Sequence, residues 1–263
     1  MSHSPDDLVL VERHQDVLTL TLNRPDQFNA MSEDMLDALQ VQLDACRDDA
    51  ALRAVVLAAR GRAFCAGHDL KQMRTHEGDA DYYRELFTRC GRVMQALVAC
   101  PVPVIARVHG TATAAGCQLV ASCDLAVAAD SARFAVSGIN VGLFCSTPAV
   151  ALTRNVPLKN AFEMLVTGQF ISAARAVDTG LINHAVPDDQ LDVAVAGLVD
   201  TILAKSPVAV RIGKAMLYRQ LNMPLSQAYE YAAGVMTENM LTDDVSEGID
   251  AFMQKRLPRF TGK

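Results

Sequence analysis

The chain has 263 residues, of which 51% are hydrophobic and 21% are charged, and its formal net charge is −6. This length and composition allow one large core, or a core with a smaller appended region. The acidic balance and the lack of any Lys/Arg-rich run argue against a nucleic-acid surface, and polar residues interrupt every apolar run before the roughly 18 residues of a membrane helix.

Two features of the sequence bear on its compartment. Residues 1–14 are acidic and carry neither the apolar stretch of a secretion signal nor an Arg-rich transit pattern. The seven cysteines are odd in number and scattered, with no CxxC pair, which indicates reduced, buried thiols rather than disulfides or a zinc site. We therefore expect a soluble protein of the cytoplasm.

The first third of the chain alternates apolar runs with helix signals. Strands are expected at 8–12 and 17–22, where VLTLTLN alternates apolar and polar residues, and a fully apolar strand is expected at 54–59. Between them, Ser32 is a typical helix cap, and the apolar spacing after it predicts a helix that ends near residue 48.

A strand–bend–helix unit follows in GRAFCAGHDLKQM, residues 61–73. Gly61 and Gly67 bracket a short extended piece, and Asp69 is placed to begin a helix. A bend of this kind presents free backbone N–H groups, as a helix N-terminus does. We interpret the ring of His68 as a solvated loop side chain, and its backbone N–H as the group of interest.

A second unit of this kind spans residues 101–124, PVPVIARVHGTATAAGCQLVASCD, after a helix predicted at 83–99. A buried strand at 102–108 leads into the small residues 112–116, and helical spacing resumes at Leu119. Small side chains let a ligand approach the backbone, and N–H groups at a helix N-terminus stabilise negative charge. An ordinary, tightly packed strand–helix turn is an equally good interpretation of this stretch alone.

The rest of the chain changes character near Pro187. Beyond it every segment has amphipathic helical spacing, so we predict an α/β core over residues 1–187 and a helical region over 188–263. Such a helical tail often packs on a neighbouring copy, which favours an oligomer. The elements expected after residue 123 are strands at 124–129 and 133–136, a loop at 137–148, helices at 162–166 and 172–179, an extended segment at 181–186, and helices at 191–204, 208–221, 226–240 and 245–255.

Two bends that present backbone N–H groups are what an oxyanion hole for an acyl thioester requires. From about residue 18 onward, the sequence resembles the enoyl-CoA hydratase/isomerase (crotonase) family. The segments that carry the resemblance are AFCAGHDLKQM, PVIARVHGTATAAGCQLVASCDLAVAAD, LNRPDQFNAM, FAVSGINVGLF and EMLVTGQFISAARAVDTGLINHAV. The resemblance implies an α/β fold: a crotonase-like ββα spiral core with a C-terminal helical trimerisation region, in trimers or pairs of trimers. It also implies acyl-CoA as ligand, with coenzyme A as part of the substrate and with no separate cofactor or metal.

The resemblance also implies roles for individual residues. The two oxyanion-hole donors fall on the backbone N–H groups of His68 and Ala115. They would act on the charge of a thioester enolate as it develops, and removal of one such donor typically costs roughly 10²–10³ in rate. The residues that match the family's substrate and coenzyme A contacts are Gln27, Phe28, Ala66, His68, Asp69, Leu70, Lys71, Ala115, Phe252 and Lys255.

The sequence departs from the family at both proton-handling positions. Hydratases of the family use two glutamates, and here the matching residues are Gln118, in AAGCQ, and Gly138, in FAVSG. An amide has no accessible pKa and glycine has no side chain, whereas a positioned acid or base typically contributes about 10²–10⁴ in rate. Candidate substitutes by position are Ser137, Asn140, Cys145, Ser146 and the ring of His68, although a structural role is the better interpretation of each.

Three hypotheses remain open from the sequence, in this order. The first is an acyl-CoA enzyme of the enoyl-CoA hydratase/isomerase kind with a weakened or altered site, in fatty acid metabolism. The second is a non-catalytic acyl-CoA-binding or scaffold protein. The third is another reaction of the same enolate, such as decarboxylation or thioester hydrolysis.

Overall fold

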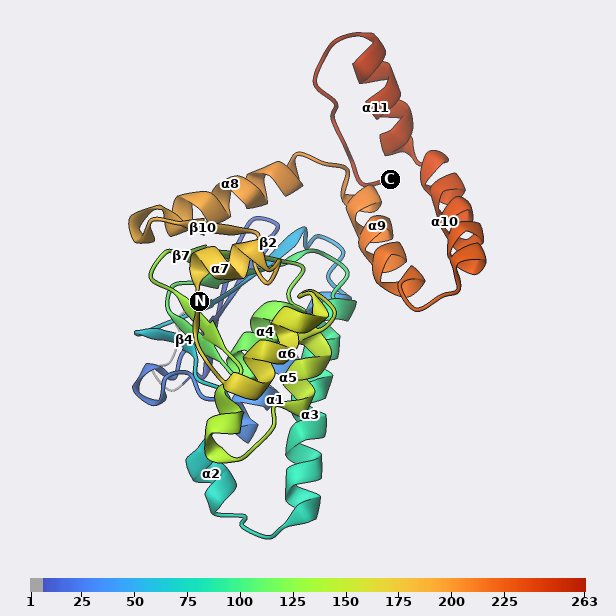
Figure 1. Ribbon diagram of the computed structural model, residues 1–263. Coiled ribbons are helices and arrows are strands. Elements are labelled where there is room, and N and C mark those ends of the chain that lie inside the picture. Colours follow the sequence, from blue (N-terminus) through green and yellow to red (C-terminus); the bar gives the residue numbers. More distant parts are fainter. Residues whose placement is uncertain (1–6) are drawn as a thin grey trace.

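A computed structural model describes residues 7–263 (Figure 1). The prediction of the cellular compartment used residues 1–14, and residues 1–6 of that segment lie outside the described residues. Within the described part, six strands form one sheet in the order β1-β2-β3-β5-β7-β10, which is antiparallel between β1 and β2 and parallel between its other neighbours. The strands are β1 (Val9–His14), β2 (Val17–Leu22), β3 (Ala54–Ala59), β5 (Val104–Val108), β7 (Leu125–Ala129) and β10 (His184–Val186).

A smaller sheet takes the strands in between. Its order is β4-β6-β8-β9, and only the pair β8 and β9 is antiparallel among these described strands. Each step from β3 to β4, from β5 to β6 and from β7 to β8 crosses from the first sheet to the second before a helix follows, so the predicted α/β class with a repeated ββα course is confirmed. The strands are β4 (Ala63–Cys65), β6 (Thr111–Thr113), β8 (Arg133–Ala135) and β9 (Ile171–Ser172).

Helices cover the two sheets. Their starts follow the predicted caps, since the Ser32 hydroxyl accepts from the Met35 N–H and the Ser172 hydroxyl accepts from the Arg175 N–H. Helices in the first two thirds are α1 (Glu33–Arg47), α2 (Leu70–Arg74), α3 (Ala80–Ala99), α4 (Ala115–Ser122), α5 (Ser146–Leu152), α6 (Leu158–Thr167) and α7 (Ala173–Asp178). Short 3₁₀ turns are η1 (Pro25–Gln27), η2 (Ser137–Val141) and η3 (Asp188–Gln190).

The segment predicted as a loop at 137–148 is partly helical, which corrects that prediction. It contains η2 and the start of α5, and Pro148 lies in the first turn of α5. A proline is tolerated there because first-turn N–H groups have no partner within the helix. The sequence prediction therefore placed Pro148 at the end of a loop, whereas it lies in the first turn of a helix.

The C-terminal helices are α8 (Leu191–Leu203), α9 (Pro207–Gln220), α10 (Leu225–Met240) and α11 (Asp243–Met253). Helix α8 packs on the first sheet, where Val195 and Val199 join Val56, Ile105 and Val127 in one buried cluster. The C-terminal arm, residues 207–263, then projects from the core on the side opposite α2 (Figure 1). The division at residue 187 stays a prediction.

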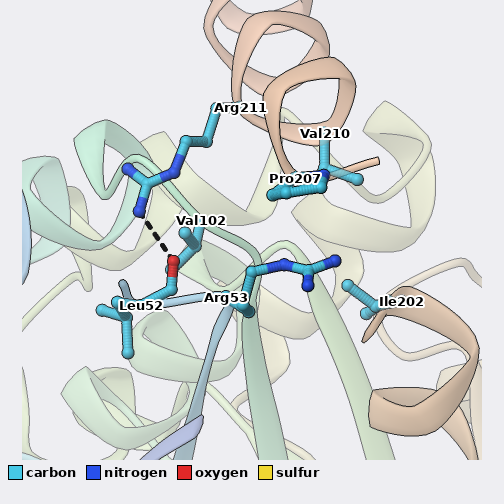
Figure 2. A pocket seen from close by; sticks show the side chains of 7 residues that line it. All are labelled: Leu52, Arg53, Val102, Ile202, Pro207, Val210 and Arg211. Carbon is cyan, nitrogen blue, oxygen red and sulfur yellow. Dashed lines mark hydrogen bonds between the residues drawn. The ribbon is translucent and has the colours of Figure 1, made fainter. Parts of the chain in front are cut away.

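The joint between the core and the arm is held by two arginines. Figure 2 shows that their guanidinium groups point away from each other: Arg211 donates to the Leu52 carbonyl at 2.7 Å, and Arg53 donates to the carbonyls of Leu203 and Lys205 at 3.0 and 2.6 Å. The crevice between them encloses no measurable free volume. It is therefore a structural joint with no room for a ligand.

Among residues 7–263, no single helix is long and apolar enough to cross a membrane. The segments Asp188–Leu203 and Pro207–Gln220 meet the length and composition criteria only as a pair, and they are bent by 102°.

Candidate functional site

The first predicted bend lies between β4 and α2. Gly67 has φ +95°, a value that residues with a Cβ rarely adopt. The amides on either side of the bend are used: Ala66 N donates to Phe28 O at 3.0 Å, and Asp69 N donates to Met31 O at 3.2 Å. The amide of His68 between them donates to no acceptor in the described residues.

The second bend lies between β6 and α4. Ala114 has φ 50° and ψ −118°, which is strained for a residue with a side chain, and its amide donates to Ala135 O at 3.0 Å. The next residue, Ala115, begins α4, and its amide also lacks an acceptor within residues 7–263. Unpaired amides are expected at a helix N-terminus.

The two bends are in contact. A Cβ on Gly67 would lie 2.8 Å from the Ala114 Cβ and 3.5 Å from the Ala115 nitrogen, and His68 is the residue that follows Gly67. At the same junction, a Cβ on Gly116 would lie 2.1 Å from the Cys65 carbonyl oxygen. Glycines therefore allow the backbones of the two bends to touch beside the residues whose amides lack acceptors.

A cleft of about 720 Å³ opens beside these bends. Its walls come from η1, the first bend, α2, α3 and the segment 137–148. Eight of the predicted site residues line it: Gln27, Phe28, Ala66, His68, Asp69, Leu70, Lys71 and Gly138. The volume suits a drug-sized or cofactor-sized ligand.

Four predicted residues do not line the cleft. Ala115 is buried beneath its wall, and Gln118 is buried with its Oε1 4.0 Å from the Cys90 sulfur of α3. Phe252 and Lys255 belong to the end of α11 and the turn after it, far from α2 and the cleft in the same chain (Figure 1). One copy of the chain thus brings together the two bends and the early loop, but not the last helix.

The comparisons with known proteins agree over nearly the whole chain. The model of the family described as Enoyl-CoA hydratase/isomerase matches residues 12–263. The chain belongs to this family. The crotonase-like resemblance read from the sequence is thereby confirmed.

Individual relatives support the same assignment. The chain is 44% identical over 261 residues to "Enoyl-CoA hydratase domain-containing protein 3, mitochondrial" of Xenopus laevis, covering 99% of this chain and 88% of the relative. It is 46% identical over 242 residues to the Homo sapiens protein of the same name, covering 92% and 80%. The crystal structure of an enoyl-CoA hydratase of Mycobacterium smegmatis is 56% identical, with a TM-score of 0.95 and coverage of 96% and 98%.

The fold fixes the position and the partners of the Asp69 carboxylate in the cleft. Asp69 caps α2, where it accepts from the amides of Lys71 and Gln72, and it accepts from Arg24 Nη1 at 2.7 Å. Burial is the largest single influence on the pKa of Asp69 and raises it, but the hydrogen bonds from Arg24 and from the amides of Gln72 and Lys71, with the Arg24 charge, together lower the pKa. Asp69 is therefore an ionised anchor of the bend, and its carboxylate is already engaged.

Gly138, which the sequence predicts to match the family's second glutamate, has no room for a side chain. A Cβ on Gly138 would lie 2.7 Å from the Leu143 carbonyl oxygen and 2.7 Å from the Cys145 sulfur. Leu143 and Cys145 therefore occupy the space that a side chain at residue 138 would need. Because a backbone oxygen is involved, a larger residue could not enter without moving the segment that carries them.

Most of the proposed substitutes are engaged elsewhere. The Ser137 and Thr113 hydroxyls lie 2.7 Å apart, Asn140 donates to Gly168 O at 3.5 Å, and Ser146 donates to Phe144 O at 3.4 Å. Burial raises the pKa of the Cys145 thiol, so it stays protonated at neutral pH. The His68 ring is the exception among them, since neither of its nitrogens has a partner in the described part of the chain. Both nitrogens are buried, so the prediction of a solvated side chain is wrong.

Sequence reasoning missed several apolar wall residues: Met73, Phe87, Val141, Leu143 and Phe144. Met73 and Phe87 come from helices whose orientation depends on tertiary packing. The run VGLF in 141–144 was a usable signal, because exposed apolar residues beside small ones are typical of a ligand-binding rim. Within residues 7–263 no cluster of three or more His, Cys, Asp or Glu side chains is arranged to hold a metal.

Proposed function

We propose that the chain binds acyl-CoA thioesters and holds the thioester oxygen between the backbone N–H groups of His68 and Ala115. The observation that carries the proposal is the contact of two bends whose amides lack acceptors, beside a cleft of suitable size. Two such donors stabilise the negative charge of an enolate in a site shielded from water. Coenzyme A enters as part of the substrate, and the proposed reaction needs no further cofactor.

The mouth of the cleft provides contacts for the coenzyme A moiety. Phe28 and Leu70 are exposed apolar groups at the rim, and the Arg62 guanidinium lies 4.4 Å from the centre of the Phe28 ring. Arg24 is paired with Asp69, and Asp26 also lines the cleft, so Lys71 and the nearby Arg62 are the positive charges proposed to meet the phosphates of the ligand. We propose that Gln27, Phe28 and the segment 66–71 bind this part of the ligand.

The proposed activity is an enoyl-CoA hydratase/isomerase-type reaction with weak or altered hydration. Both glutamate positions lack a carboxylate, Gln118 faces Cys90, and Asp69 is engaged by Arg24. These observations also favour the second candidate, a protein that binds acyl-CoA without turnover. The same proposed oxyanion hole would also serve decarboxylation or thioester hydrolysis, which is the third candidate.

Hydration of crotonyl-CoA tests the first candidate. We expect a rate at least about 10²-fold below that of a family hydratase with both glutamates, because each positioned acid or base contributes about 10²–10⁴. Calorimetry with butyryl-CoA should still show binding. A family-typical hydration rate would show that the missing carboxylates do not matter, and no binding of any ester would remove the proposal.

A double variant, Gln118→Glu with Gly138→Glu, sharpens this test. Restored hydration is not expected, because residue 138 has no space and residue 118 is directed toward α3. The melting temperature should fall instead. Gln118→Glu alone serves as the matched control, since it keeps the side-chain size.

We also propose that the chain forms a homotrimer or a dimer of trimers through the C-terminal arm. The arm exposes many large apolar side chains, which a protein usually covers at an interface. A neighbouring copy could also bring Phe252 and Lys255 to the cleft, which one chain does not do. The exposed apolar residues of the arm include Leu221, Leu225, Tyr229, Met236, Met240, Leu241, Phe252, Met253 and Leu257.

Light scattering after size exclusion checks the assembly. We expect the mass of three or six chains, and a variant with Met236→Glu and Leu241→Glu should shift it toward one chain, because buried unpaired charges disrupt an interface. Val41→Glu, at an exposed apolar residue of α1, is the control and should leave the mass unchanged. A monomeric natural protein would contradict the proposal.

The predicted cytoplasmic location stays a proposal, and the two vertebrate relatives are named as mitochondrial.

A further inference from the structure

Helix α2 forms one wall of the cleft, yet none of its five residues is buried. Of these residues only Met73 packs against the apolar core, and it does so in part. The place of this short helix therefore depends on polar contacts. At its start, the Asp69 carboxylate accepts from the amides of Lys71 and Gln72. The side chain of Gln72 then links the helix to the start of α1.

This link is a pair of hydrogen bonds between Gln72 and Glu33. Gln72 Oε1 accepts from the Glu33 backbone amide at 3.0 Å, and Gln72 Nε2 donates to Glu33 Oε2 at 2.9 Å. The first bond satisfies an N–H at the beginning of α1 that has no partner within its own helix. The Glu33 carboxylate also accepts from the Tyr82 hydroxyl of α3 at 3.4 Å and lies 3.6 Å from Arg89. Three helices thus meet at one half-buried carboxylate.

The residues just before Glu33 hold the bend that precedes α2. Met31 N donates to Gly67 O at 2.8 Å, and Met31 O accepts from Asp69 N at 3.2 Å. His68, whose backbone N–H is one of the two proposed donors, lies between these two anchor points in the chain. One short segment therefore holds both the bend and the helix that follows it, so a displacement of α2 would be passed to the amide in the bend.

We propose that Gln72 is a positioning residue, whose paired hydrogen bonds with Glu33 keep the His68 N–H directed at the thioester oxygen. The inference rests on the proposed binding of acyl-CoA, and it adds a residue that does not itself line the cleft. The strength of an oxyanion hole depends on donor geometry, and a misplacement of about 1 Å can cost about 10². Loss of the pair should therefore weaken the stabilisation of an enolate more than the binding of an ester as such.

Gln72→Glu tests this role with little change in size. The new carboxylate would face the Glu33 carboxylate, so two groups that bind each other would repel instead. Acetoacetyl-CoA should then bind about tenfold more weakly by calorimetry, because the His68 amide is displaced from the enolate oxygen, while butyryl-CoA should lose much less. The ultraviolet absorption of the enolate of bound acetoacetyl-CoA should fall as well. All measurements are made at a temperature where a thermal melt shows each variant to be folded.

Exchanging the two groups separates positioning from general damage. Glu33→Gln alone keeps an oxygen that accepts from Gln72, so it should bind both esters normally. Combined with Gln72→Glu, it rebuilds an amide–carboxylate pair and should recover the affinity for acetoacetyl-CoA. Gln72→Met, which has similar length and no charge, should show a smaller loss of the same kind and replaces Gln72→Glu if that variant does not fold.

The outcomes distinguish this inference from the proposed function. Unchanged enolate binding in Gln72→Glu, an equal loss for both esters, or an exchanged pair as weak as Gln72→Glu alone would each overturn the positioning role. A natural protein that binds neither ester would overturn the proposed function instead.

Discussion

The Gly67→Ala variant is expected to bind acetoacetyl-CoA about 10²-fold more weakly than the natural protein. The new Cβ would lie 2.8 Å from the Ala114 Cβ and 3.2 Å from the Thr113 carbonyl oxygen, so the two bends must separate. Acetoacetyl-CoA forms an enolate, whose charge is on the oxygen that both amides are proposed to meet. Loss of one donor at such an oxygen typically costs roughly 10²–10³, and a shift of about 1 Å has a similar effect.

The backbone conformation adds to the steric effect. Gly67 has φ +95°, so alanine at this position is strained and some loss of stability is expected as well. Calorimetry gives the affinity, and circular dichroism with a thermal melt shows whether the fold is kept. Butyryl-CoA, which does not form an enolate readily, should lose less affinity than acetoacetyl-CoA.

Gly197→Ala and Gly213→Ala are matched controls for this variant. Both glycines lie in helices, in α8 and α9, and a Cβ at either one would meet no atom within 4 Å. Alanine in a helix is favoured over glycine by about 1 kcal/mol, so these variants should bind normally and be no less stable. Unchanged acetoacetyl-CoA affinity in a folded Gly67→Ala protein would show that the amides at the two bends do not act together.

Local sequence signals were sufficient for most elements and for the two bends. Ser32, Asp69 and Ser172 each cap a helix as the sequence indicated, because capping depends on residues only three positions apart. The predicted helix at 83–99 begins three residues earlier, at Ala80, where Asp79 accepts from the Tyr82 amide. Such errors at helix ends are expected from local patterns.

The parts of the site that depend on long-range packing were not predictable in this way. Nothing near Gln118 in the sequence indicates that its side chain meets Cys90, because α3 and α4 are placed by the core around them. The filling of the Gly138 position by Leu143 and Cys145 depends on the path of a whole segment. The sequence predicted two positions without a carboxylate, and the structure adds that Leu143 and Cys145 occupy the space beside Gly138.

The variant Lys214→Ala is expected to destabilise the protein by about 3–5 kcal/mol, since it leaves a buried carboxylate without its cation. Lys214 of α9 is buried against the core, where its ammonium donates to Asp124 Oδ2 at 2.5 Å and to the carbonyls of Leu97 and Val102 at 3.2 and 2.9 Å. Asp124 also accepts from the Val104 amide at 2.7 Å. This network fastens the C-terminal arm to the core, and urea unfolding at pH 7 measures its loss.

Two further variants show whether the unpaired charge of Asp124 causes the loss of stability. The Tyr218 hydroxyl donates to Asp124 Oδ1 at 2.8 Å, and Tyr218→Phe removes only that one hydrogen bond, so about 1 kcal/mol is expected. Lys214→Met combined with Asp124→Asn keeps volume and removes both charges, while the Asn oxygen still accepts from Val104 or Tyr218. The double variant should therefore be more stable than Lys214→Met alone, because the unpaired charge is gone. If the two were equally unstable, lost packing rather than a stranded carboxylate would explain the effect, and the arm would be held chiefly by apolar contacts.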